Sequence, residues 1–180
     1  TYFDGAGFEN PEGFYQPSAG QSGWRGTAHA SISDLGSFAN GVSRTWMGWA
    51  YRDASGTDDA LFGGSNNGID GIVCQLAAGG NNVQFSPQQS GGATTWTGAW
   101  PGNGQWVHWA VVFNEPANLV SLYINGALVS TETQSLPFVT GSTLEVGSSA
   151  GVSVFDGKMQ GFAAYEQALT ATQIANIFAA

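Results

Sequence analysis

The residues best suited to hold a ligand lie between Thr94 and Gly104, where two tryptophans stand among small polar residues. Trp96 and Trp100 share this segment with threonine, proline, asparagine and several glycines, a composition too rich in glycine and proline for a central strand. Aromatic rings in a polar loop stack on the apolar face of a pyranose, and amides such as that of Asn103 bind its hydroxyl groups. We expect a sugar-binding platform at Trp96, Trp100 and Asn103. The alternative is that the same two rings pin the loop to the body of the domain.

The other tryptophans are assigned by their setting in the sequence. Trp24 stands beside Arg25 and fits either a core or a binding role, so we keep it as a further ligand-binding candidate. The tryptophans on predicted strands are expected in the hydrophobic core; these are Trp46, Trp49, Trp106 and Trp109.

Known catalytic motifs are missing from the sequence. It contains no Gly-x-Ser-x-Gly elbow, no His-Glu-x-x-His helix and no phosphate-binding glycine loop. Glu9 and Glu12 flank a proline, and the remaining glutamates are far apart along the chain, at Glu115, Glu132, Glu145 and Glu166. Carboxylates from different strands can still converge in a folded domain. We predict that the protein is not an enzyme, and we assign no catalytic residue.

The charge balance and the single cysteine exclude several classes of protein. Four basic residues face thirteen acidic ones, for a net charge of −9, which disfavours binding to nucleic acid or to an anionic membrane. No apolar run reaches the roughly 18 residues of a membrane span, so we expect no membrane insertion. Cys74 lies in the apolar run 72–76 and is expected to be a small buried hydrophobe.

The elements that must position these residues are short strands. Trp106–Phe113 alternates so that Val107, Trp109, Val111 and Phe113 share one face. Residues 119–124 alternate again and reach Asn125-Gly126, a pair that favours a type I′ turn and predicts a hairpin with 127–132. Thr170 and Gln173 form a capping box before a helix predicted over 171–178.

The whole pattern predicts one all-β domain over residues 1–180, an antiparallel two-sheet jelly-roll sandwich with a short C-terminal helix. Loops rich in glycine, serine and asparagine are expected at 33–44 and 88–105. The predicted strands are 2–4, 12–16, 25–32, 45–52, 60–63, 69–77, 82–86, 106–113, 119–124, 127–132, 143–147 and 158–165.

This succession of motifs resembles the laminin-G-like domains of the concanavalin A-like lectin/glucanase superfamily. The order and spacing of the motifs carry the resemblance, which covers nearly the whole chain. The matching segments are Tyr2-Phe3-Asp4-Gly5, Thr45-Trp46-Met47-Gly48-Trp49, Trp106 with His108 and Ala110, Tyr123-Ile124-Asn125-Gly126, Leu144-x-Val146-Gly147, Phe155-Asp156-Gly157 and Ala168-Leu169-Thr170. His108 stands at the family's recurrent strand histidine, which implies a structural role.

The resemblance makes calcium the expected metal, because relatives hold it with aspartates and loop carbonyls, the oxygen ligands that it prefers. The best local cluster is Asp53, Asp58 and Asp59, which surround a glycine turn; an ordinary polar hairpin loop is the alternative. A second candidate pairs Asp4 with Asp156, because the first and last strands of the family run side by side. Gln160 stands where the family often has an acidic residue, which weakens this second site.

Two classes of function remain. The favoured one is a non-catalytic recognition or adhesion module that binds carbohydrate or a cell-surface ligand through its loops. The alternative is a structural protein that decorates a larger assembly such as a virion capsid, a tail or a surface layer, with neighbouring subunits as partners. A glycan-degrading enzyme is less favoured, because hydrolases of this fold pair two carboxylates on one strand. We expect an extracellular location or the surface of an assembly, although no signal peptide is visible at the start of the chain.

Overall fold

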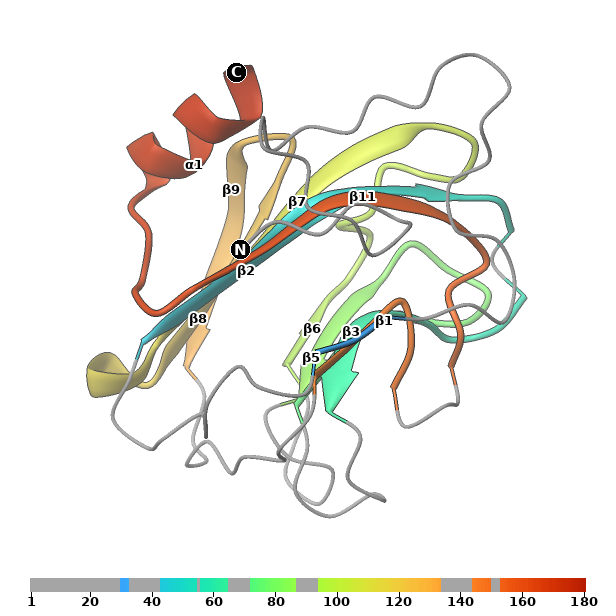
Figure 1. Ribbon diagram of the computed structural model, residues 1–180, viewed down its shortest axis with the longest axis horizontal. Helices are drawn as coiled ribbons and strands as arrows, with labels where there is room; N and C mark the ends of the chain where they lie inside the picture. The colour runs from blue at the N-terminus through green and yellow to red at the C-terminus, as the bar shows by residue number, and fades with distance from the viewer. Residues whose placement is uncertain are drawn as a thin grey trace.

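The structure is a computed structural model that describes residues 30–32, 43–54, 56–64, 72–86, 94–133, 144–149 and 153–180 (Figure 1). A 3₁₀ helix, η1 (Glu115–Ala117), joins β7 to β8, and a helix, α1 (Ala171–Ala179), follows the last strand. The described strands are β1 (Ala30–Ile32), β2 (Arg44–Arg52), β3 (Asp59–Gly64), β4 (Val73–Leu76), β5 (Val83–Ser86), β6 (Thr94–Trp96), β7 (Trp106–Asn114), β8 (Leu119–Ile124), β9 (Ala127–Thr133), β10 (Leu144–Val146) and β11 (Gly157–Tyr165).

These strands form two antiparallel sheets that face each other (Figure 1). Within the described residues one sheet has six strands, in the order β1-β10-β3-β4-β5-β6, and the other has five, in the order β11-β2-β7-β8-β9. Neighbours that are distant in sequence, such as β11 beside β2, are typical of a jelly roll. The predicted all-β sandwich with a C-terminal helix is therefore confirmed.

The core lies between the inner faces of the two sheets. Its members in β7 are the four residues that alternation places on one face: Val107, Trp109, Val111 and Phe113. Trp46 from β2 and Cys74 from β4 are also fully buried in this core. Burial raises the pKa of the Cys74 thiol, so the thiol stays protonated and the expected role as a small hydrophobe is confirmed.

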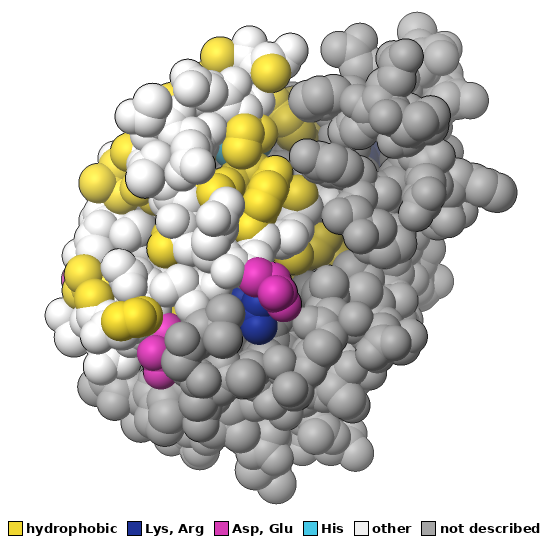
Figure 2. Space-filling view, turned by 60° about the vertical axis from the view of Figure 1, so that its left-hand side comes forward, with side chains coloured by type: hydrophobic (Ala, Val, Ile, Leu, Met, Phe, Trp, Pro, Cys, Tyr) yellow, Lys and Arg dark blue, Asp and Glu magenta, His cyan; other side chains and the backbone are white. Residues whose placement is uncertain are grey.

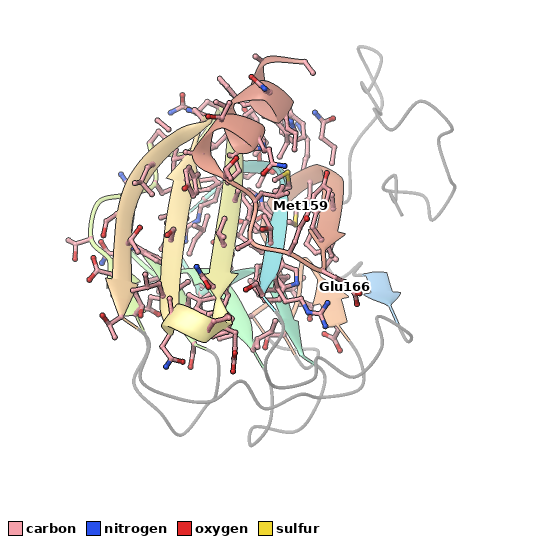
Figure 3. All side chains as sticks on the ribbon, turned by 90° about the vertical axis from the view of Figure 1, so that its left-hand side faces the viewer. Met159 and Glu166 are labelled. Atoms are coloured by element: carbon pink, nitrogen blue, oxygen red, sulfur yellow. The ribbon has the colours of Figure 1, made fainter. Side chains whose placement is uncertain are left out.

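The helix α1 packs on the outer face of the five-stranded sheet (Figures 1 and 3). The Gln173 amide donates to Thr170 Oγ1 at 3.3 Å and the Thr170 amide to Gln173 Oε1 at 2.8 Å, so the predicted capping box is confirmed. Ile174 is fully buried in a second, smaller apolar cluster together with Met47 and Leu169. In Figure 3 the chain leaves Glu166, crosses the outer face and enters α1.

Several predicted elements are matched and one is corrected. The Asn125-Gly126 hairpin forms, with φ of 49° and 75° at the two residues. The stretch 88–105, predicted as a loop, contains strand β6, whose residues Thr94, Thr95 and Trp96 pair with β5. β-Branched and aromatic residues such as these favour strands. The predicted strands 2–4 and 12–16 lie outside the described residues. No helix in the described part of the chain has the length and apolar character needed to cross a membrane.

Candidate functional site

Trp96 and Trp100 lie in the core and do not form an exposed platform. Their side chains are 4% and 0% exposed, and both belong to the main apolar cluster. Pairing with β5 places Trp96 opposite Val83, so its ring points inward. The Trp100 amide donates to the Asn81 carbonyl oxygen at 2.8 Å, which fixes this loop to the β4–β5 turn. The expectation of sugar stacking on these two rings is corrected: they pin the loop to the sandwich.

The other predicted ligand residues are either exposed or outside the described part of the chain. Asn103 is exposed on the same loop, next to Gly104, whose amide donates to the Arg52 carbonyl oxygen at 2.8 Å. Trp24 lies outside the described residues, and so does Asp4. Asn103 is therefore the one member of the predicted ligand-binding set that the described structure leaves at the surface.

The three aspartates predicted to hold calcium do not gather around a common point. Asp53 is exposed, whereas Asp58 Oδ1 accepts a hydrogen bond from the Ala78 amide at 2.7 Å. Asp59 is fully buried and its Oδ2 lies 2.6 Å from Arg52 Nε. In the described ranges no three His, Cys, Asp or Glu residues are arranged to hold a metal ion. These aspartates do not fit calcium, because two of them are already used inside the fold.

Arg52 uses its whole guanidinium group inside the protein. Besides Asp59, it donates from Nη1 to the Gly80 carbonyl oxygen at 2.8 Å and from Nη2 to those of Thr57 and Ala77, each at 3.2 Å. Asp59 Oδ1 in turn accepts from the Asp156 amide at 3.2 Å. Burial raises the pKa of Asp59, while Arg52 acts in the opposite direction. The arrangement is a buried hydrogen-bond network at one end of the sandwich, which we call the Arg52–Asp59 network.

The outer face of the five-stranded sheet carries a pair of half-buried rings close to this end. Tyr51 on β2 and Trp106 on β7 are cross-strand partners, with ring centroids 5.8 Å apart and planes at 64°. On the neighbouring strand β11, Lys158 pairs with Tyr51 and holds its Nζ 4.6 Å from the centroid of that ring. We call Tyr51, Trp106 and Lys158 the outer-face platform.

Polar loop residues stand beside the outer-face platform. A Cβ atom added to Gly104 would lie 3.9 Å from the Tyr51 hydroxyl, so the loop passes next to this ring. Asn103 and Gln105, the two neighbours of Gly104, are exposed. The platform therefore combines aromatic rings, one cation and adjacent side-chain amides, a set suited to stacking on a sugar ring and binding its hydroxyl groups.

A second row of side chains adjoins the platform, two residues further along each strand. Gln160, Trp49 and His108 are register partners on β11, β2 and β7. The Phe178 ring from α1 lies against this row, 5.6 Å from the Trp49 centroid with planes at 29°, and 5.6 Å from the His108 centroid. His108 is 2% exposed, and burial lowers its pKa to about 4, so the imidazole is neutral at pH 7.

The expectation that Trp49 and Trp106 belong to the core is corrected as well, because both are only half buried. The sequence contains the signal that identifies them. Trp46 and Trp49 are three residues apart on one strand, as are Trp106 and Trp109, so the members of each pair must point to opposite faces. Since Trp46 and Trp109 are fully buried, the other two must point outward.

Few charged side chains interrupt this side of the molecule, where apolar groups gather among uncharged polar ones (Figure 2). Of the cations in the described residues, Arg44 pairs with Glu166 at 2.8 Å and Arg52 pairs with Asp59. Lys158 makes no salt bridge with a described residue. Its ammonium group on the platform is therefore the described cation most available to a ligand.

The two-sheet fold and the aromatic outer face of the five-stranded sheet together define a lectin-like β-sandwich. The family model of the concanavalin A-like lectin/glucanases superfamily, in its laminin G type, matches residues 25–175. The chain belongs to this superfamily, and the resemblance noted from the sequence motifs is confirmed. A search of curated protein sequences found no match.

Solved structures share the fold at low sequence identity. A heptameric SAP-like pentraxin from Limulus polyphemus is 14% identical, with a TM-score of 0.64 over 87% of this chain and 80% of the pentraxin. The CBM40 module of a Ruminococcus gnavus sialidase, bound to α2,3-sialyllactose, is 12% identical, with a TM-score of 0.60 over 84% of this chain and 98% of the module. The NanB sialidase of Streptococcus pneumoniae is 17% identical, with a TM-score of 0.63 over 87% of this chain. This chain spans only 27% of that sialidase and less than half of several other matched structures.

Proposed function

We propose that the protein is a non-catalytic carbohydrate-binding module whose ligand stacks on the outer-face platform. The observation that carries this proposal is the pair of half-buried rings, Tyr51 and Trp106, beside the exposed amides of Asn103 and Gln105. Membership of a lectin-containing superfamily supports it, and so does the similarity to a module bound to sialyllactose. Lys158 supplies a cation that suits a glycan carrying a carboxylate, so sialylated glycans are part of the proposed ligand class. Such a module acts outside the cell or on the surface of an assembly.

The test is binding to a glycan panel that includes lactose, sialyllactose and glucose oligomers with α-1,4 or β-1,4 linkages. Trp106→Ala removes one ring of the platform, and we expect it to weaken binding by about 2 kcal/mol or more, roughly thirtyfold. Tyr51→Phe keeps the ring and removes only the hydroxyl group, so it should retain most of the affinity.

A matched control lies on the opposite sheet. Gln84 is half buried on β5 and accepts a hydrogen bond from Gln75 at 3.1 Å. Strand β5 belongs to the six-stranded sheet, whereas the platform lies on the five-stranded sheet. Gln84→Ala should leave glycan affinity unchanged. Equal affinity of Trp106→Ala and the parent protein would remove the platform from consideration, and an absence of binding across the panel would remove the function itself.

The non-catalytic part of the proposal is tested separately. Release of reducing ends from β-glucans, alginate, agar and carrageenan should stay at background with the parent protein. Turnover that disappears on substitution of one aspartate or glutamate would show an enzyme.

Calcium remains part of the proposal only through Asp4 and Asp156. Asp156 is exposed, and its carbonyl oxygen accepts from the Asp53 amide at 2.9 Å, so the two loops meet there. If calcium binds to the native state at this place, it should raise the melting temperature and a chelator should reverse the rise. Asp156→Asn should abolish the effect. An unchanged melting temperature with excess calcium excludes this site.

A role in a larger assembly is the second candidate, and strand β9 favours it. Leu128 and Val129 are 51% and 42% exposed on this strand, which is an edge of the five-stranded sheet as far as the described residues define it. Exposed apolar residues on an edge strand are typical of a contact with another chain. Light scattering should then show an oligomer that Leu128→Glu dissociates. A monomer at all concentrations disfavours this candidate.

A further inference from the structure

Several buried polar side-chain atoms of the described residues have no hydrogen-bond partner, and two of them lie in one row of the five-stranded sheet. These two are Nδ1 of His108 and Oε1 of Gln160. Buried polar groups in native proteins are almost always hydrogen-bonded, and each exception requires a reason. Both residues belong to the row that adjoins the outer-face platform, on either side of Trp49.

The Phe178 ring covers Trp49 and His108 in this row, and Gln160 lies next to Trp49 on the side away from His108. The Phe178 ring stacks on Trp49, and it also approaches the β8–β9 turn so closely that a Cβ atom at Gly126 would lie 2.8 Å from its Cδ1. Trp49 and His108 meet edge to face, with centroids 5.3 Å apart. The seat of Phe178 thus has an aromatic surface beneath and a glycine at its side. One unsatisfied polar atom belongs to His108 in the seat, and the other belongs to Gln160, the cross-strand neighbour of Trp49.

This chemistry suits a sugar ring better than it suits a phenyl ring. A pyranose has an apolar face that stacks on indole and hydroxyl groups that both donate and accept hydrogen bonds. Gln160 Oε1 accepts such a bond, and Nδ1 of a neutral imidazole either accepts or donates one, according to its tautomer. The phenyl ring of Phe178 can satisfy neither atom.

The position of the seat relative to the platform is equally informative. Trp49, His108 and Gln160 each lie two residues from Tyr51, Trp106 and Lys158 on the same strands. Two residues of a strand span about 7 Å. A glycan that stacks on the platform and continues along the strands therefore reaches the seat of Phe178 next.

The last turn of α1 is the weakly held end of the helix. Its N-terminal end is fixed by the capping box and by the buried Ile174, whereas the amide of Ala180 reaches the Ile177 carbonyl oxygen at a long 3.4 Å. Ile177 and Phe178 are only half buried, and the neighbouring Ala179 is exposed. Helix ends open locally at a small cost in free energy. Phe178 can therefore leave its seat without unfolding of the sheet.

We infer that the seat of Phe178, formed by Trp49, His108 and Gly126, is together with the adjoining Gln160 a second sugar subsite that the ring of Phe178 occupies until a longer glycan displaces it. This inference rests on the proposed function and extends it: the ligand is an oligosaccharide that spans two rows of the sheet, with one unit on the platform and the next in the seat. Phe178 then acts as an internal competitor that selects for chain length.

The experiment measures affinity by calorimetry as a function of glycan length. The ligands are glucose, its α-1,4 and β-1,4 oligomers of up to six units, lactose and sialyllactose. Phe178→Ala vacates the seat. We expect the dissociation constant of the longer ligands to fall at least fivefold relative to the parent, with no change for the shortest ligand that binds. Adding Gln160→Leu to Phe178→Ala should cancel this gain, because the leucine cannot accept a hydrogen bond.

Two further variants separate the subsite from a general loosening of the helix. Ile177→Ala removes a neighbouring apolar side chain that packs in the smaller cluster, and it should show the length dependence of the parent. Phe178→Leu keeps apolar contact and should give a smaller gain in the same direction if Phe178→Ala is too unstable to measure.

The outcomes are distinct. A length dependence that is identical in parent, Phe178→Ala and Phe178→Leu overturns the subsite, and the proposed function stands if Trp106→Ala still weakens binding. An equal gain for short and long ligands also overturns it, because Phe178 would then obstruct the platform itself. The absence of any glycan binding in all variants overturns both the subsite and the proposed function.

Discussion

Trp100 lies in the loop before strand β7 and Trp106 is the first residue of that strand, yet the first ring is fully buried and the second is half exposed. Trp100 is carried inward because its amide is bound to the β4–β5 turn, whereas Trp106 begins strand β7 on the face opposite to Trp109. Residue type and local composition are the same for both. The difference in role arises from the neighbours to which each backbone is bonded.

Burial of Trp100 predicts a large loss of stability on truncation. Trp100→Ala should lower the free energy of unfolding by about 3–5 kcal/mol, because it removes a large apolar group and leaves a cavity. Urea denaturation measures this, with Asn103→Ala on the same loop as the control, which should change stability by less than about 0.5 kcal/mol. Unchanged stability of Trp100→Ala together with lost glycan binding would restore the loop as the binding platform.

The depressed pKa of His108 predicts a loss of stability in mild acid. Its pKa is about 4 in the folded protein against 6.5 for the free side chain. Between these values only the unfolded chain takes up the proton, so the free energy of unfolding should fall by up to about 3 kcal/mol as the pH drops from 6.5 to 4. Trp49 and Phe178 face the imidazole, and the Asn125 side chain binds the His108 amide; none of these groups is charged.

His108→Phe isolates this contribution from that of the carboxylates, which also titrate in acid. The variant retains ring contacts with Trp49 and Phe178 but cannot take up a proton. Its stability should therefore decline less steeply than that of the parent between pH 6.5 and 4, as followed by urea denaturation at each pH. Parallel profiles for the two proteins would show that His108 is accessible to protons in the folded state.

At the scale of elements, the β8–β9 hairpin and helix α1 depend on one glycine. Gly126 has φ of 75°, which the turn requires, and it also leaves room for the Phe178 ring. The Asn-Gly pair therefore specifies a turn and a docking surface at once. Only the first of these is visible in the sequence, since the hairpin signal is local and the helix contact joins distant segments.

This double role predicts a coupling between the two residues. Gly126→Ala should cost about 1–2 kcal/mol for the left-handed backbone, plus the cost of moving Phe178. In the Phe178→Ala background the second cost disappears, so a double-mutant cycle should give a coupling energy of about 1 kcal/mol. Gly98→Ala is the matched control: its φ is 66°, but nothing lies within 4 Å of an added Cβ, so its effect should be independent of Phe178. Additive effects at Gly126 and Phe178 would mean that the helix end adjusts freely.

Local signals in the sequence specify the elements well and the site poorly. Alternation in 106–113, the Asn-Gly turn and the Thr170–Gln173 capping box each involve neighbouring residues, and all three are found in the structure. The place of Trp100 and the partner of Asp59 depend on hydrogen bonds between distant segments, which composition does not reveal. An aspartate cluster and a tryptophan loop are therefore ambiguous as sequence signals, and both proved to be structural here.

At the scale of the whole molecule, the Arg52–Asp59 network connects five segments that meet at one end of the sandwich. Arg52 lies at the end of β2 and Asp59 at the start of β3, while Gly80 belongs to the β4–β5 turn. Asp156 precedes β11, and the Gly104 amide ties in the loop beside the platform. The two sheets and the loop beside the platform thus share one fully buried ion pair.

Removal of either charge should therefore be far more damaging than removal of a surface charge. Asp59→Ala leaves the guanidinium group of Arg52 buried without its counter-ion, and Arg52→Met leaves the carboxylate in the same state; each should cost about 3–5 kcal/mol in urea denaturation. The double variant Arg52→Met/Asp59→Leu should cost less than the sum of the two single changes, because no unpaired charge remains. It should not return to parental stability, since the carbonyl groups of Thr57, Ala77 and Gly80 lose their donor. The Arg44–Glu166 pair is the control: Glu166 is 77% exposed, so Glu166→Ala should cost less than about 1 kcal/mol. Asp59→Ala could prove to lower the free energy of unfolding no more than Glu166→Ala does. The Arg52–Asp59 network would then not hold this end of the sandwich together, and the position of the Asn103 loop beside the platform would depend on other contacts.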